Sequence, residues 1–142
     1  MPKSRRGSAR AASRPRAARS AHHDRFERYV DRAVRAIPSP FREALAQVAI
    51  VIADEPSREL LRAERMGPDE TLYGYYQPGV DTLYAWGDTL EPARIVIFRL
   101  PLEQDFPDPL DLEDEVRITI LHELAHHLGI DDEDHLAELG ID

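Results

Sequence analysis

The chain has 142 residues, which is room for one compact domain, and hydrophobic residues make up 42% of it. It contains no cysteine, which excludes disulfides, thiolate metal sites and cysteine nucleophiles, so any transition-metal site must use histidine and carboxylate ligands. No apolar run approaches the roughly 20 residues that span a bilayer, and the amino terminus lacks the apolar core of a secretory signal. We therefore expect a soluble, cytoplasmic protein without a membrane partner.

The net charge of −9 is unevenly distributed along the chain. Residues 1–25 hold eight basic side chains and one acid, whereas residues 26–142 hold 10 basic and 26 acidic side chains. The first 20 residues are mainly Arg, Ala, Ser and Pro, a composition typical of disorder. We predict a disordered basic tail over 1–22 and one folded domain over 23–142.

The basic tail has two interpretations. It could contact nucleic acid weakly through counterion release, or it could be a solubilising extension that folds back on its own acidic domain. We favour the extension, and we expect no nucleic-acid partner for the acidic domain itself.

Apolar spacing predicts the elements of the first third of the chain. A helix is expected over 23–36 and must end at Pro38, because proline is not tolerated in a helix interior. A short helical turn over 41–47 should lead into a buried strand over 48–52, which is almost entirely β-branched.

The middle of the chain combines two clear strands with less regular segments. Residues 54–70 are equally compatible with helix and loop. Strands are predicted over 71–76 and 94–99, separated by an exposed loop over 80–92. Three prolines make an irregular connection the expectation over 101–109.

A long helix is predicted near the carboxyl end, from about residue 110 to residue 128. Asp108 or Asp111 is suited to cap its amino terminus, and Gly129 stands where a left-handed helix stop is expected. A last short helix is predicted over 132–139.

This long helix contains the residues that indicate chemistry. His122 and His126 are four positions apart, so they project from the same helix face and can bind one ion together. Glu123 lies beside that face, where it can act as general base on a water activated by the metal. The expected metal is zinc, which lowers the pKa of its bound water to about 7 and so produces hydroxide near neutral pH.

A third protein ligand is needed, because two imidazoles alone would hold zinc weakly. Gly129 permits the chain to reverse after the helix, and Asp132 is six positions after His126, the spacing of the third ligand in an HExxHxxGxxH arrangement. We expect Asp132 to be this ligand, and we keep His135 and Glu138 open as alternatives.

Other polar residues have candidate supporting roles. His127 points about 100° away from its neighbour, as a surface histidine or one that supports the ligands from outside the metal shell. A hydrolase also needs a donor for the developing oxyanion, for which candidates are Tyr73, Tyr75, Tyr76 and Tyr84.

At these residues the chain resembles the small bacterial zincin-like metallopeptidases. The resemblance covers roughly residues 25–141, and its most specific part is the segment His122-Glu123-x-x-His126-His127-x-Gly129. It implies an α+β fold, in which a small mixed sheet packs on an amino-terminal helix and the active-site helix. The sequence differs from the metzincins, because Asp132 replaces a histidine and no methionine follows the motif.

We therefore predict a zinc-dependent metallopeptidase with His122, His126 and Asp132 as ligands, Glu123 as general base, and peptides or unstructured proteins as substrates. The alternative is a non-catalytic module of the same fold that binds a protein partner, with weak or absent metal. The oligomeric state is open.

Overall fold

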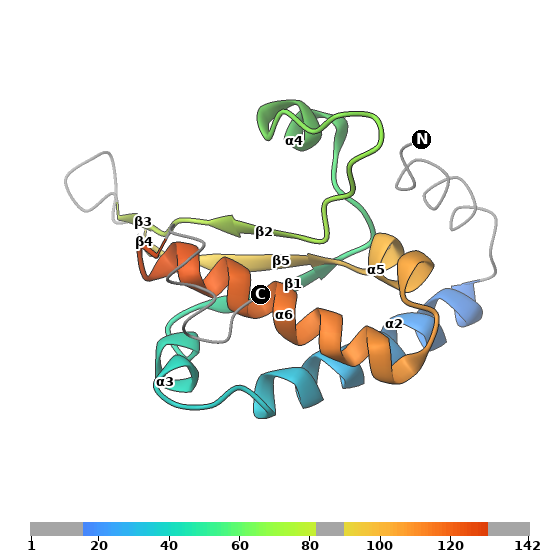
Figure 1. Ribbon diagram of the computed structural model, residues 1–142, viewed down its shortest axis with the longest axis horizontal. Helices are drawn as coiled ribbons and strands as arrows, with labels where there is room; N and C mark the ends of the chain where they lie inside the picture. The colour runs from blue at the N-terminus through green and yellow to red at the C-terminus, as the bar shows by residue number, and fades with distance from the viewer. Residues whose placement is uncertain (1–15, 82–89, 131–142) are drawn as a thin grey trace.

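A computed structural model describes residues 16–81 and 90–130 (Figure 1). Its elements, in chain order, are α2 (Arg16–Arg35), α3 (Phe41–Leu45), β1 (Ala49–Ala53), α4 (Arg58–Ala63), β2 (Gly74–Gln77), β3 (Val80–Asp81), β4 (Leu90–Glu91), β5 (Arg94–Phe98), α5 (Arg99–Asp105) and α6 (Pro109–His127). No helix in these two ranges is long and apolar enough to cross a membrane.

The main sheet has three strands in the order β1-β5-β2. The strand β5 lies in the middle, parallel to β1 and antiparallel to β2, so the sheet is mixed. A separate two-stranded ribbon joins β3 to β4. The predicted α+β fold with a small mixed sheet is thus confirmed, and both β1 and β2 are edge strands.

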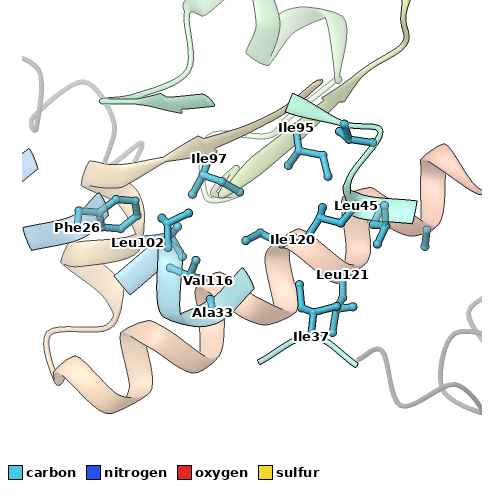
Figure 2. Packing of buried hydrophobic residues seen from close by; sticks show 14 of the residues in the cluster. Phe26, Ala33, Ile37, Leu45, Ile95, Ile97, Leu102, Val116, Ile120 and Leu121 are labelled. Carbon is cyan, nitrogen blue, oxygen red and sulfur yellow. The ribbon is translucent and has the colours of Figure 1, made fainter. Parts of the chain in front are cut away.

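Two helices cover one face of the sheet, with α6 lying against β2 and β5 and α2 lying against α6 (Figure 1). Apolar side chains from all three layers meet in one core, shown in Figure 2. Helical spacing places three residues of α2 in it, Ile37 follows just after that helix, and β5 and α6 supply the rest of its centre: Phe26, Val30, Ala33, Ile37, Ile95, Ile97, Val116, Ile120 and Leu124.

Both ends of α6 are fixed by local hydrogen bonds. Asp108 is the amino-terminal cap, and its carboxylate accepts a hydrogen bond from the backbone N–H of Leu110 at 2.8 Å. At the other end Gly129 adopts a left-handed φ of 75°, and the N–H of Ile130 donates to the carbonyl of Ala125 at 2.8 Å. This is a Schellman stop, which turns the chain sharply after the helix.

Two helix and strand starts differ from the sequence prediction, and one undecided segment proves partly helical. The helix α2 begins at Arg16 rather than at residue 23, because Ala and Arg favour helix even where no core-facing pattern exists. Strand β2 begins at Gly74 and not at residue 71. In the segment 54–70, Ser57 caps a short helix by accepting a hydrogen bond from a backbone N–H of α4.

Two predicted loops contain regular structure. The ends of the expected loop 80–92 pair as the β3–β4 ribbon, while its centre is outside the described residues. The expected irregular connection 101–109 is wrong, because α5 occupies its first half. Pro101 is the third residue of this helix, where a backbone N–H would have no partner within the helix. The predicted helix 132–139 lies outside the described residues.

An ion pair with a buried guanidinium joins α5 to the end of β1. The Arg99 side chain is only 2% exposed, and its guanidinium donates to Asp54 at 2.9 Å and to Glu103 at 2.8 Å. The N–H of Leu100 also donates to the backbone carbonyl of Asp54 at 2.9 Å. These contacts hold the carboxyl ends of β1 and β5 together. They also fix the position of the first residues of α5.

Glycine at position 74 is required by the packing of β2 on α6. A Cβ atom at this position would lie 2.6 Å from Cγ2 of Thr119 and 3.5 Å from Cγ of Glu123. The first distance is well inside van der Waals contact, and Thr119 is a buried, β-branched residue that cannot easily turn away. The missing side chain therefore sets how closely the helix approaches the edge strand.

We predict that Gly74→Ala lowers the free energy of unfolding by about 1–3 kcal/mol, because the added methyl group overpacks the interface. Adding Thr119→Ser removes the clashing methyl and should recover a large part of this loss, which chemical denaturation would measure. The matched control is Gly67→Ala, where a Cβ meets only the flexible end of Glu70. Strictly additive effects of the two substitutions would contradict this account.

Candidate metal centre and active site

The helix α6 carries His122, Glu123 and His126 on one side of its last two turns. The Glu123 side chain is 15% exposed and the His126 side chain is 50% exposed. The opposite side of the same turns is buried through Leu124 and Ala125. The polar residues thus lie at the rim of the core, where an ion and water can reach them.

The environment of Glu123 suits a proton acceptor. Burial raises the pKa of its carboxyl group above the ordinary value, while the nearby His126 and His122 imidazoles lower it in part. The Nδ1 atom of His126 lies 3.2 Å from Oε1 of Glu123. The carboxylate of Glu64, after α4, also raises the pKa of Glu123. The net result is a carboxylate that accepts a proton more readily than one in water.

His127, the next residue along α6, contacts a tyrosine of strand β2. The hydroxyl of Tyr76 lies 2.8 Å from Nδ1 of His127, and their ring centroids are 5.6 Å apart. Because side chains alternate along a strand, Gly74 and Tyr76 both face α6. Strand β2 therefore meets the helix both at Gly74 and at the Tyr76–His127 pair.

The other tyrosines that we considered as oxyanion donors are placed differently. Tyr73 donates its hydroxyl hydrogen bond to Asp105 and packs edge-on against Phe106, and burial raises its pKa. Tyr75 lies on the opposite face of the sheet from α6. Tyr84 is outside the described residues. Among the described tyrosines, Tyr76 is the one with a hydrogen bond to a histidine of α6.

The donor set fits a divalent transition metal. His122 and His126 offer imidazole nitrogens one helical turn apart, and the contact between Glu123 and Nδ1 of His126 leaves the other ring nitrogen of that histidine available. The third ligand is expected beyond the Schellman stop at Gly129. Its three candidates all lie outside the described residues: Asp132, His135 and Glu138.

A second group of potential ligands occurs on α2. Within residues 16–81 and 90–130, His23, Asp24 and Glu27 are the one set of three whose donor atoms all approach within 4.8 Å. These side chains are on the surface of the helix, and a pair of exposed charges one turn apart is common without a metal. We therefore treat this group as a control for the site on α6.

Three features of the site were not predicted from the sequence. The contact of Gly74 with α6 had a signal, because glycine inside a strand often marks a close backbone approach. The bond between Tyr76 and His127 had none beyond their residue types. The effect of Glu64 on Glu123 could not be foreseen, because segment 54–70 had no assigned structure.

A small mixed sheet, a long helix packed on it and a two-histidine motif on that helix define a class of small α+β domains. A family model described as zincin-like metallopeptidase matches residues 45–141. The chain belongs to this family, as the resemblance at the motif indicated, and membership implies a metal, typically zinc.

One solved structure shows the same fold. It is a conserved hypothetical protein from Thermus thermophilus, 24% identical, and the match has a TM-score of 0.52 and covers 75% of this chain and 94% of that one. No curated protein matches the chain.

We predict that the Tyr76–His127 hydrogen bond contributes about 0.5–1.5 kcal/mol to stability. A double-mutant cycle with Tyr76→Phe and His127→Asn, measured by chemical denaturation, should give a coupling energy in this range. Tyr75→Phe is the control on the same strand, with an expected change within about 0.5 kcal/mol. A coupling energy of zero would show that the two side chains act independently.

Proposed function

We propose that this protein is a zinc-dependent metallopeptidase that hydrolyses peptide bonds, with His122 and His126 as metal ligands and Glu123 as general base. The observation that carries the proposal is the half-open face of α6, where the mostly buried Glu123 carboxylate, with a raised pKa, lies 3.2 Å from Nδ1 of His126 and is influenced by the His122 imidazole. Membership of the zincin-like metallopeptidase family supports it.

Each residue has a separate task in this reaction. Zinc, when bound, acts as a Lewis acid that acidifies water and polarises a carbonyl group. His122 and His126 would hold it through ring nitrogens, and Asp132 would add a carboxylate oxygen. Glu123 takes a proton from the attacking water on a carboxylate oxygen and delivers it to the nitrogen of the leaving amine.

The proposed substrates are peptides or unstructured protein segments. The edge strand β2 lies against the active-site helix, and within the described ranges only β5 pairs with it. An extended chain can align with such an edge through backbone hydrogen bonds. A folded protein would have to expose a strand first. The cytoplasmic location and the absence of a nucleic-acid partner stay predictions.

Substitution of the histidines tests the metal site. We expect about one zinc per chain in protein purified without chelators, and loss of that zinc in His122→Ala and His126→Ala. Glu123→Gln should keep the zinc but lower the peptidase rate by at least about 100-fold, because the proton acceptor is lost. Elemental analysis and cleavage of an unfolded protein substrate measure the two effects.

The control for this experiment is His23→Ala combined with Glu27→Gln, which disrupts the ligand group on α2. Zinc content should not change in this variant. If this variant lost its zinc while the variants of His122 and His126 kept it, the assignment of the metal site to α6 would be wrong. If Glu123→Gln kept full activity, the catalytic mechanism would be wrong. Zinc without any turnover would favour the non-catalytic module.

A second test identifies the third ligand. Among Asp132→Ala, His135→Ala and Glu138→Ala, we expect only the first to weaken zinc binding, by at least about tenfold, because it alone removes a ligand. Competition with a zinc-sensitive chelator dye measures the affinity. The same loss in His135→Ala or Glu138→Ala, with Asp132→Ala unchanged, would reassign the ligand.

A further inference from the structure

The edge strand β1 lacks the usual devices that prevent association. Its sequence is Ala-Ile-Val-Ile-Ala over Ala49–Ala53, without charge or proline, and the Val51 side chain is 37% exposed. In the described ranges, β1 pairs with β5 alone. Edge strands of stable monomers usually carry charged residues, proline or a bulge, because unpaired backbone groups otherwise attract another strand.

The backbone of β1 is oriented to accept a further strand. The N–H of Ala49 donates to the carbonyl of Ala93, just before β5, at 2.9 Å. Because backbone groups alternate in direction along a strand, Val51 and Ala53 also point toward β5. The N–H and C=O groups of Ile50 and Ile52 therefore point away from the sheet, along its outer edge.

An apolar groove runs beside this edge. Its volume is about 820 Å³, and it lies between α2, α3 and β1. Its apolar floor includes Val30, Val34 and Leu45, together with Ile50 and Ile52. Both isoleucines lie on the helix side of the sheet, level with the buried Ile95 and Ile97, but they are only half-buried. The hydrophobic core is therefore incompletely covered on the side of the sheet where β1 lies.

The rim of the groove carries both signs of charge. Glu27 and Asp31 lie along α2 on one side, and Arg35 and Arg42 follow toward α3. This mixture contrasts with the strongly acidic balance of residues 26–142. Two copies of this rim placed in opposite directions bring acidic groups of one copy toward basic groups of the other, which suits a symmetric interface.

We propose that the partner of this edge is a second copy of the same chain, bound through antiparallel pairing of β1 with β1. The strand reads the same in both directions, so a twofold axis at Val51 places Ile50 opposite Ile52 and Ala49 opposite Ala53 of the other copy. Every outward backbone group of Ile50 and Ile52 then gains a partner. The result is a continuous six-stranded sheet.

The proposed dimer leaves the metal site accessible. Since β1 and β2 are opposite edges of the sheet, the two active-site helices end up toward the outer ends of the combined sheet. The interface therefore uses none of the residues assigned to metal binding or catalysis, and its test is independent of the proposed activity.

Light scattering of the full chain at about 100 µM tests the proposal, because interfaces of modest size commonly give micromolar dissociation constants. We expect a mass of twice 16.2 kDa for the unaltered chain and 16.2 kDa for Val51→Lys. Two lysines would face each other at the axis, where like charges oppose pairing. The control is Leu110→Lys, at a 77% exposed position on α6, which should remain dimeric.

Hydrogen exchange gives a second readout that does not depend on a variant. The amides of Ile50 and Ile52 should become protected as the protein concentration rises, while that of Val51 is protected throughout by β5. A monomer at all concentrations would overturn the proposal. So would a dimer that leaves these two amides unprotected, because its interface would lie elsewhere.

Discussion

The close approach of α6 to β2 is the constraint on which the rest of the site depends. One helix must bury an apolar side in the core and present histidines and a carboxylate on the adjoining side. Gly74 makes this possible, because a Cβ atom there would collide with Cγ2 of Thr119 on the helix. The sheet can then support the helix at close range, and Tyr76 extends this support to His127.

The electrostatics of Glu123 follow from the same packing. Burial against β2 disfavours its charged form, and the two imidazoles partly restore it. A carboxylate with only one of these influences would serve poorly: full burial would keep it protonated, and full exposure would make it a weak base. Its place at the rim of the core gives a group that can both take and return a proton.

The sequence predicted the elements whose patterns reflect burial. The strand at Arg94–Phe98 and the helix with its Asp108 cap and Gly129 stop were expected because apolar spacing and capping residues are local signals. The helix α5 was missed because it depends on tertiary contacts of Arg99 with Asp54 and on proline in the first turn. The bond of Tyr76 to His127 joins residues 51 positions apart, which no local pattern encodes.

The buried guanidinium of Arg99 has a consequence for how the strands find their alignment. Arg99 and Asp54 are 45 positions apart, and each directly follows one of two parallel strands. A shift of one strand along the other would carry the Asp54 carboxylate away and leave the buried guanidinium with Glu103 as its remaining carboxylate partner. The Arg99–Asp54 contact therefore favours the observed alignment of the two strands, and it acts as a selector of register during folding.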